Sequence, residues 1–581
     1  MGVVCTLTGD MYRSSFGNYN PWKVPFVPNQ SAALRCGQND RACFQLLLYN
    51  DEDMTVTCDR TPALHKIWPL PAVRVECRLE GDFGCGIGLW LVEDVRDDDG
   101  NYKAEILSSA TRKVQEKLRV QQVFLEIETE KNREPGLYRG QVNVYECRLF
   151  GDEKKVCSLP FTLEVLPVCL PPLSESGFEL DLWQHHTSLA RTYETPLWGE
   201  EHFALMERYL ETLAKLGQRA ATLIVSEAPW SGQWSAWYRT NPSDVFEYNM
   251  IRLSKDRAGR FHYDFTAAER YIRLCQKHGV DREIEIFGLA GVWTLEDAGL
   301  GRVMEDGEEA LRVRYYEEES GCMRYLRKQE EADAYLAAID RMLYENGWAD
   351  IARVACDEPA DIALFRRNLK RLKGLMPHVG FKVTICSEAV FLEDYEEISD
   401  CVVNLPLLSG RTEQLSGLAQ RYHLSFYTAM EPPHPNTFLG CHPAEIRFLP
   451  WLSLLLGMDR YLRWAAWLWP DRPFDPDSYH FQKFRAGGMQ FLYPGKDGKP
   501  LCSLRCHQLA RGIRDYLIIK EYEKVKGRTG LAAKIAGGLL KAPLETMFDS
   551  RQAEDFLPLE QEAFDRITDG LLTELAEGRE Y

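Results

Sequence analysis

The chain is 581 residues long, which is enough for about two to four domains. Its 69 lysines and arginines against 87 aspartates and glutamates give a net charge of −18, which disfavours broad contact with nucleic acid or anionic lipid. Aromatic residues make up 11% of the chain and include 14 tryptophans, whose rings suit the apolar faces of sugars. A neutral partner therefore fits the composition better than a polyanion.

Cysteine use and the N-terminus indicate a cytoplasmic protein. The 17 cysteines run from Cys5 to Cys506 without a CxxC pair, so neither a disulfide framework nor a zinc ribbon is predicted. Cys502, Cys506 and His507 look like metal ligands only locally, since no complementary cluster lies nearby in the sequence, and we expect no metal. No secretion signal begins the chain and no apolar run approaches about 18 residues, so no membrane insertion is expected.

From about residue 31 to residue 168, short segments of alternating apolar and polar residues recur between Gly, Asn, Asp and Pro clusters. Examples are CFQLLLYN, VRVECRLE, QVFLEIETE and QVNVYECRLF. This pattern predicts a β-sandwich. The periodicity changes at the proline-rich segment LPVCLPPLSESG, so we place an N-terminal accessory domain at residues 1–172.

After this boundary, eight apolar segments typical of strands alternate with helical patterns such as EEHFALMERYLETLAKLG. The segments are FELDLWQHH, AATLIVS, EIEIFGLA, IARVACDEP, FKVTICS, CVVNLPL, LSFYTAM and YLRWAAWLW. They predict a TIM-like (β/α)8 barrel over residues 173–495, giving a multidomain β plus α/β protein. An open doubly wound sheet is the alternative, but no glycine-rich phosphate motif follows a strand. Residues 496–581 are predicted to form a C-terminal helical extension packed on the barrel.

Two adjacent carboxylates, Asp357 and Glu358, follow the fourth strand segment in RVACDEPAD. One interpretation is a solvated helix start, with the acids near the positive end of the helix dipole and Pro359 in the first turn. In a barrel, however, reactive groups lie in the loops that follow the strands. The pair is therefore the candidate catalytic centre, and Glu431 in TAMEPPHPN is a weaker rival.

Other strand ends carry polar and aromatic side chains that can join the pair in one pocket. They are Asp181, Gln184, His185, His186, Trp230, Trp293 and Tyr427. The histidines have an alternative interpretation as hydrogen-bonded core residues, and the tryptophans as packing groups rather than ligand contacts.

Several motifs together resemble glycoside hydrolase family 123. They are LDLWQHHTSLARTYETPLWGEEHF, APWSGQ, GRFHYDF, CDEPADI, YTAMEPPHPNTFL, RYLRWAAWLWP and FLYPGKDGKPLCSLRCHQLARGIRDY, in this order along the chain. The resemblance spans about Phe178 to Tyr516, and the N-terminal segments are similar to the accessory domain of that family. Members of the family resemble one another as retaining β-N-acetylgalactosaminidases that use an adjacent Asp-Glu pair, which maps to Asp357 and Glu358.

The resemblance implies substrate-assisted catalysis, in which the acetamido oxygen on sugar C2 attacks C1 and no enzyme nucleophile is needed. A carboxylate that accepts the acetamido N–H balances the positive charge of the cyclised intermediate, while a protonated carboxyl donates to the leaving oxygen. We therefore expect Asp357 to stay ionised. We expect its charge and partial desolvation to raise the pKa of Glu358, the general acid.

The resemblance also carries over further substrate-binding residues. Tyr427 is placed to donate to the acetamido oxygen, and Asn436 lies in the PNTF stretch. Aromatic positions on which the sugar ring packs in the family correspond to Trp464 and Trp469. The expected substrate-binding residues also include His185, Trp230 and Trp293. The chain departs from the family at Ala466 and Trp467, where members tend to have a Tyr-Asn pair. This departure removes polar groups that hydrogen-bond to sugar hydroxyls, so the sequence does not decide which configuration at sugar C4 the protein prefers.

The leading hypothesis is an exo-acting β-N-acetylgalactosaminidase for terminal β-linked N-acetylgalactosamine on oligosaccharides or glycolipid head groups. No cofactor and no nucleic-acid partner are expected. One alternative keeps the chemistry but changes the sugar to N-acetylglucosamine. The other, from a different class, is a non-catalytic glycan-binding protein on a hydrolase barrel. Loss of one carboxylate would mark that class, and this chain retains both.

Overall fold

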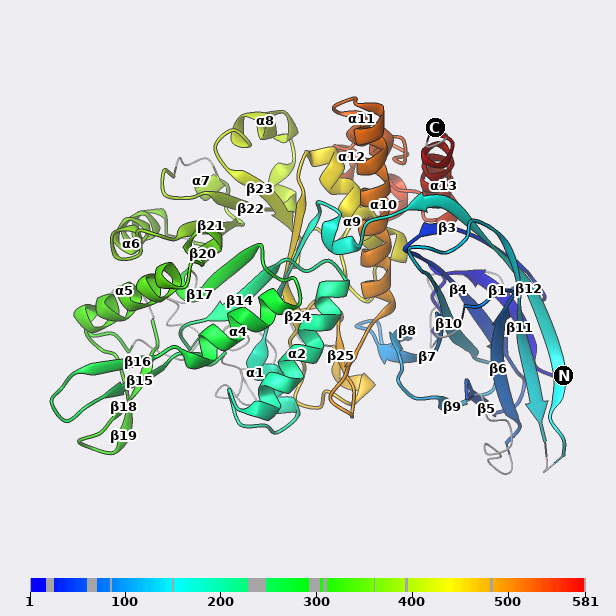
Figure 1. The fold of residues 1–581 in the computed structure, drawn as a ribbon, viewed down its shortest axis with the longest axis horizontal. Coiled ribbons are helices and arrows are strands. Elements are labelled where there is room, and N and C mark those ends of the chain that lie inside the picture. Colours follow the sequence, from blue (N-terminus) through cyan, green and yellow to red (C-terminus); the bar gives the residue numbers. More distant parts are fainter. Residues whose placement is uncertain are drawn as a thin grey trace.

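The computed structural model describes residues 2–16, 26–59, 70–83, 86–148, 151–227, 247–291, 303–306, 311–359, 361–391, 395–480 and 484–578. The N-terminal strands lie at one end of the molecule and a second group of strands and helices lies at the other (Figure 1). The long helix α10 (Leu504–Lys526) runs between the two groups. None of the described helices is both long enough and apolar enough to cross a membrane.

The N-terminal strands form two sheets of six. In order, the first contains β1 (Val4–Gly9), β4 (Asp40–Tyr49), β10 (Val120–Thr129), β7 (Ile87–Arg96), β8 (Tyr102–Leu107) and β2 (Ser15–Phe16). The second contains β3 (Ala32–Gln38), β12 (Lys154–Cys169), β11 (Gly136–Cys147), β6 (Ala72–Leu79), β5 (Met54–Thr57) and β9 (Arg112–Gln115). Alternate residues of both sheets, such as Phe44, Leu46, Phe161 and Leu163, are buried in one shared core, as the period of two in the sequence predicts.

The eight predicted strands of the second region are all present, and they form one parallel sheet. They are β13 (Glu179–Gln184), β14 (Ala220–Ile224), β17 (Glu283–Gly291), β20 (Ala352–Asp357), β21 (Gly380–Ile385), β22 (Asp400–Asn404), β23 (His423–Tyr427) and β24 (Arg460–Trp467). The order is β13-β24-β23-β22-β21-β20-β17-β14, so the two strands of this sheet that come first in the sequence are its two edges.

Glutamine side chains help to close the sheet between β13 and β14. The backbones meet there at a single bridge between Leu180 and Gln218. Gln218 Oε1 accepts the Leu182 N–H at 2.8 Å, and Gln184 Oε1 accepts the Thr222 N–H at 2.9 Å. Because these amides occupy backbone groups that a strand would otherwise pair, the eight strands form a nearly closed barrel rather than an open doubly wound sheet.

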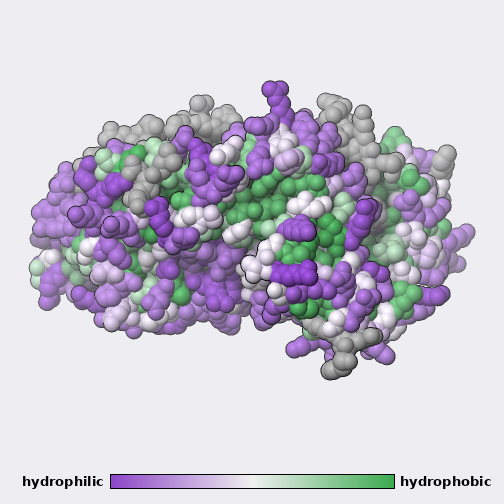
Figure 2. All heavy atoms as spheres, turned by 90° about the horizontal axis from the view of Figure 1, so that it is seen from above, coloured by the Kyte–Doolittle hydropathy of each residue, from purple (hydrophilic) through white to green (hydrophobic). Residues whose placement is uncertain are grey.

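Helices fill the connections and the C-terminal region. The described ones are α1 (His186–Thr192), α2 (Glu200–Lys215), α4 (Thr266–Lys277), α5 (Gln329–Glu345), α6 (Ile362–Leu375), α7 (Glu388–Phe391), α8 (Leu415–Leu418), α9 (Pro443–Leu456), α10, α11 (Leu531–Gly537), α12 (Thr546–Asp549) and α13 (Gln561–Glu577). The face of the molecule over α11 and α12 gathers apolar residues near its middle, while the end that carries α5 and α6 is mostly hydrophilic (Figure 2).

Helix α10 joins the C-terminal region to both groups of strands. It packs on α9 at Gly512, where an added Cβ would lie 2.3 Å from the Arg447 carbonyl oxygen. On its other side Arg505 donates to Glu105 of β8 at 2.6 Å, and Arg514 forms a double hydrogen bond with Asp40 of β4, both at 2.6 Å. The predicted C-terminal extension therefore packs between the two groups of strands, not on the barrel alone.

The lower half of the barrel interior is charged. The ammonium group of Lys382 on β21 is hydrogen-bonded to Asp181 on β13 and to Glu283 and Glu285 on β17. Arg460 on β24 adds a 2.7 Å contact to Glu283. All five side chains are buried, so each charge depends on its partners for the solvation that water would otherwise supply.

We expect Lys382→Met to lower the free energy of unfolding by about 3–5 kcal/mol, because it leaves several buried carboxylates without their shared cation. The matched control is Lys215→Met, which removes an exposed pair with Glu211 and should change stability by less than about 1 kcal/mol. Urea unfolding of both variants gives the comparison. Equal midpoints would show that the interior cluster contributes no more than a surface pair.

Candidate active site

The barrel interior is built in layers, and the acid pair lies above an apolar one. Residues two apart on each strand point inward, so the charged layer is followed by Trp183, Ile224, Phe287, Ala355, Val402, Tyr427 and Leu462. Trp183 connects the layers, since its indole N–H donates to Glu285 at 3.2 Å. Asp357, two residues after Ala355, is the last residue of β20 and belongs to the next layer up.

Thr384 on the neighbouring strand β21 holds both members of the pair. It lies opposite Asp357 in the strand register, and its hydroxyl donates to Asp357 Oδ1 at 2.9 Å. The same hydroxyl oxygen accepts the Glu358 N–H at 3.0 Å. Glu358 has a φ of +45°, in the left-handed region that costs a non-glycine residue on the order of 1–3 kcal/mol. This turn lets two consecutive carboxylates share one site.

The pair is not a solvated helix start. Helix α6 begins at Ile362, and its N-cap is Asp361, which accepts the Leu364 N–H at 2.9 Å. Asp357 belongs to the strand instead, and both acids are half-buried. Glu431, the rival carboxylate, is exposed on the loop after β23.

Tyr427, at the end of β23, contacts the pair from across the barrel mouth. Its side chain is 3% exposed, and its hydroxyl donates a hydrogen bond to Glu358 Oε1. Burial and the neighbouring Glu358 charge raise the pKa of Tyr427 well above its usual value, so the phenol remains a donor. The predicted meeting of Tyr427 with the acid pair is thus present in the structure.

The electrostatics of the pair differ from the sequence expectation. We expected an ionised Asp357 and a raised pKa on Glu358. Burial, and next the negative charge of Glu358, instead raise the pKa of Asp357 to about 8, against the opposing hydrogen bond from Thr384. Near neutral pH the two acids therefore favour a state in which they share one proton. The physical reason is that Asp357 points into the barrel, where its charge loses more hydration.

Other predicted residues are mostly buried and contact neighbouring strands and loops rather than the acid pair. His185 is fully buried, and its Nε2 lies 2.9 Å from the Trp464 carbonyl oxygen while its Nδ1 lies 3.5 Å from Glu247. Trp464 is half-buried above the apolar layer. Trp469 is buried in the main core, where its indole N–H donates to the Leu492 carbonyl at 2.8 Å.

Asn436 is also fully buried, and its amide is occupied by the loop that follows β23. The amide nitrogen donates to the Pro432 carbonyl at 2.6 Å, and the oxygen accepts from the Thr437 N–H at 2.7 Å. Trp230 and Trp293 lie outside the described residues. The structure therefore brings Asp357, Glu358 and Tyr427 together. Trp464 lies on β24, the strand between β23 and β13, and His185 directly follows β13.

Arg463 is a supporting residue that sequence reasoning missed. It is 1% exposed and donates to the carbonyls of Thr428 and Ala429 and to Asn436 Oδ1, at 2.6, 3.0 and 3.1 Å. Burial lowers its pKa, since carbonyl oxygens rather than a carboxylate surround it. It fixes the loop directly after Tyr427. A charged residue in the apolar strand RYLRWAAW was the available signal.

Cys386 and Thr384 were also missed. Both follow Lys382 at intervals of two along β21 and beyond it, so the alternation in FKVTIC would have placed them on the inner face. Burial, Glu358 and Asp357 raise the pKa of the Cys386 thiol to about 12, which keeps it protonated beside the pair.

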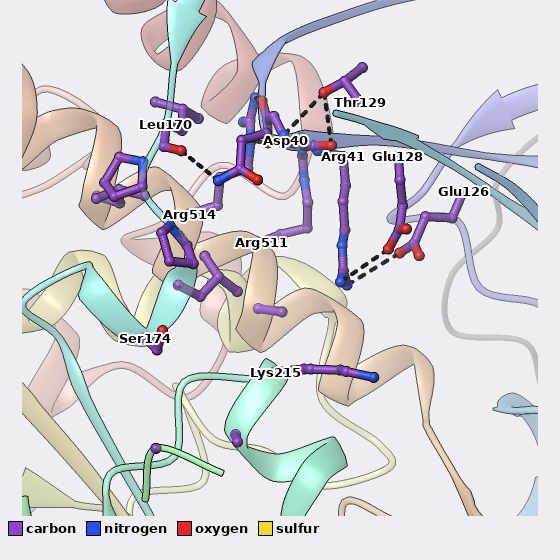
Figure 3. A pocket seen from close by; sticks show the side chains of 18 of the residues that line it. Asp40, Arg41, Glu126, Glu128, Thr129, Leu170, Ser174, Lys215, Arg511 and Arg514 are labelled. Carbon is purple, nitrogen blue, oxygen red and sulfur yellow. Dashed lines mark hydrogen bonds and ion pairs between the residues drawn. The ribbon is translucent and has the colours of Figure 1, made fainter. Parts of the chain in front are cut away.

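A cavity of about 670 Å³ lies at the other end of the barrel strands. Its walls come from the N-terminal sheet, α10, and the residues that precede β14 and β17. Several of its charged side chains are paired: Figure 3 shows Arg41 beside Glu126 and Glu128, with 3.2 Å between Arg41 and Glu128, and Arg514 binds Asp40. Because reactive groups of barrels lie at the carboxyl ends of the strands, we assign the acid pair as the candidate active site.

Comparison with known proteins shows a similarity to glycoside hydrolases. The chain shares its fold, with a TM-score of 0.75 and 17% identity, with a family 123 glycoside hydrolase from Clostridium perfringens described for glycolipid glycan hydrolysis. The match covers 99% of this chain and 100% of that one. A putative glycoside hydrolase from Bacteroides vulgatus matches weakly, with a TM-score of 0.33, 10% identity, and 86% and 79% of the two chains covered. No curated protein sequence matches the chain.

The model of the glycoside hydrolase 123 catalytic domain matches residues 183–522. The protein is a glycoside hydrolase. It belongs to glycoside hydrolase family 123.

Above pH of about 8 we expect kcat/KM to fall, because the pair then loses the proton that acid catalysis requires. Thr384→Val should move this alkaline limb to higher pH. The Thr384 hydroxyl stabilises the ionised form of Asp357, so its loss raises that pKa further. Thr212→Val on α2 is the control and should leave the profile unchanged. A limb that moved to lower pH in Thr384→Val would contradict this account.

Proposed function

We propose that the protein is an exo-acting, retaining β-N-acetylgalactosaminidase that uses the 2-acetamido group of its substrate as the nucleophile. The carrying observation is the adjacent Asp357 and Glu358, held by one hydroxyl at a barrel mouth and contacted by the Tyr427 hydroxyl. No second carboxylate is needed on the opposite face of the sugar, because the substrate supplies the attacking oxygen.

Substrate binding relocates the proton of the pair in this proposal. The acetamido N–H donates to Asp357, which favours the charged form of that carboxyl, so the proton passes to Glu358. The Tyr427 hydroxyl turns from Glu358 to the acetamido oxygen and no longer stabilises an ionised Glu358. The sharing of one proton by the pair in the ground state and the catalytic role of Asp357 as an anion are thereby compatible.

The reaction then has two steps. The acetamido oxygen forms a bond to C1 as the C1–O bond to the leaving group breaks, and Glu358 gives its proton to the departing oxygen. The cyclic intermediate carries a positive charge that Asp357 balances. Water next attacks C1, gives its proton to Glu358 and reopens the ring, which leaves the β configuration unchanged.

The preference for N-acetylgalactosamine over N-acetylglucosamine is supported less directly than the roles of the two acids. Ala466 and Trp467, where the chain departs from the family pattern, are both fully buried, and the Trp467 indole donates to the His185 carbonyl at 2.8 Å. The departure therefore changes packing behind the pocket, and N-acetylgalactosamine remains our proposed sugar over N-acetylglucosamine.

The proposal extends to the architecture and location. We take residues 1–172 as a β-sandwich accessory domain, 173–495 as the catalytic (β/α)8 barrel and 496–581 as a helical extension. Asn436, His185 and Trp469 act as positioning groups for the loop and for Trp464, while Trp464, Trp230 and Trp293 remain the proposed sugar contacts. A cytoplasmic location and catalysis without a cofactor complete the proposal.

Different leaving groups separate the roles of the two acids. Glu358→Gln should retain much more activity on a nitrophenyl N-acetyl-β-galactosaminide than on a natural disaccharide, because nitrophenolate leaves without a proton. Asp357→Asn should lose a factor on the order of 10²–10³ on both substrates, because charge balance does not depend on the leaving group. The measurement is kcat/KM for the wild type and both variants.

A substrate without the acetamido group provides the control for Asp357. Once that group is absent, Asp357→Asn should add little further loss, since the two act as a unit. Equal losses of Glu358→Gln on both leaving groups, or a harmless Asp357→Asn, would contradict the assignment. Binding of N-acetylgalactosamine without any turnover would favour the non-catalytic alternative.

A further inference from the structure

A small four-stranded sheet projects from the barrel within the connections that follow β14 and β17 (Figure 1). Its strands are β16 (Phe261–Asp264), β15 (Arg252–Lys255), β18 (Arg314–Glu317) and β19 (Cys322–Tyr325), in this order. One face is packed inward through buried residues such as Leu253 and Tyr315. The sheet therefore presents its opposite face outward.

The outward face carries one continuous row of side chains. The strand register places His262 beside Ser254, Ser254 beside Tyr316, and Tyr316 beside Met323. Tyr316 is 46% exposed and Met323 is 55% exposed, and the register places these two large side chains next to each other on this face. We call this row, with the flanking Arg252, Asp264 and Arg314, the outer face.

The outer face forms a wall of a groove of about 560 Å³, a volume within the usual range of roughly 300–1,000 Å³ for ligand sites. Trp198 and Tyr248 also line this groove. Aromatic rings thus occur together with charged and hydroxyl groups. That mixture suits a saccharide, whose rings have apolar faces and polar edges. An apolar peptide or lipid would desolvate the exposed Arg252 and Asp264 without giving either a new polar contact.

The outer face is tied to the active end of the barrel through Glu227. Glu227 lies three residues past β14 and forms an ion pair with Arg314 and a 2.7 Å hydrogen bond from the Tyr325 hydroxyl. Strand β14 pairs with β17, and the last residue of β17, Gly291, pairs with Asp357. Ile224, the end of β14, pairs with Phe287, so it lies two strand spacings, about 10 Å across the sheet, from β20 and in the layer below Asp357.

We propose that the outer face is a subsite for the sugar units on the leaving side of the scissile bond, with Tyr316 as its stacking residue. The inference rests on the proposed function, since it assumes that the terminal acetamido sugar lies at Asp357 and Glu358. The protein then recognises an extended glycan, and an aryl glycoside occupies only the inner part of the site.

Tyr316→Ala tests the subsite with two substrates. On N-acetyl-β-galactosaminyl lactose we expect kcat/KM to fall about three- to tenfold, the usual worth of one aromatic contact, whereas the nitrophenyl glycoside should be cleaved as by the wild type. Tyr344→Ala on α5, where the tyrosine is 59% exposed, is the matched control and should change neither value. Equal loss on both substrates, or no loss on the trisaccharide, would overturn the subsite.

Calorimetry separates failure of the subsite from failure of the proposed function. In the Glu358→Gln background, addition of Tyr316→Ala should weaken binding of the trisaccharide by the same factor and leave binding of free N-acetylgalactosamine unchanged. If the wild type cleaves neither substrate, the proposed reaction fails, yet these titrations still decide the subsite. Trisaccharide binding that is absent, or that does not respond to Tyr316→Ala, overturns it.

Discussion

The buried ammonium group of Lys382 is the interaction on which the barrel depends. It gathers carboxylates from β13, at one end of the sheet order, and from β17, the strand next to the other end. Such a cluster adds little net stability over an apolar core, but it is costly to disrupt, because any missing partner leaves an unpaired charge away from water. It therefore specifies which strands face one another in the interior more than it strengthens them.

This charged layer also shapes the site above it. The lower interior is filled by ion pairs and the next layer by Trp183, Phe287 and their neighbours, so access to the interior is confined to the carboxyl ends of the strands. There Thr384 sits two residues above Lys382 on the same strand and binds both acids. One strand thus supplies the cation of the lower layer and the hydroxyl that orients the proposed acid and its partner.

The sequence predicts the repetitive parts of the fold and the residues at strand ends. The eight barrel strands and the acid pair are of this kind, because apolar runs and the position of a residue at the end of a run are local properties. The closure of the barrel by Gln184 and Gln218 could not be predicted from the sequence. A glutamine whose side chain replaces backbone pairing has the same sequence pattern as any polar residue in a strand. The pKa of Asp357 was misjudged for a similar reason. Which of two adjacent acids points inward depends on the left-handed turn at Glu358, which no local pattern indicates.

The burial of each side chain distinguishes candidate substrate contacts from core residues, which the amino-acid type alone does not. Trp464 and Trp469 are five residues apart in one motif, yet one lies half-buried above the apolar layer and the other is enclosed in the main core. Asn436 is a residue type that often binds ligands, but here its amide is hydrogen-bonded to the backbone of the loop after β23. Conversely, Thr384 binds both acids and Arg463 binds the loop after β23, although the sequences of their strands are mainly apolar.

The pairing of α10 with the N-terminal sheets has a consequence for the order of synthesis. Asp40 and Glu105 are buried against Arg514 and Arg505, which follow them by 474 and 400 residues. At about 5–20 residues per second, a ribosome needs roughly 25–95 s to add the later partner of Asp40. During that interval these two carboxylates have no cation from α10, and the face that carries them must stay hydrated. The N-terminal sheets therefore acquire their final surface only after α10 has been made, although their own strands are complete several hundred residues earlier.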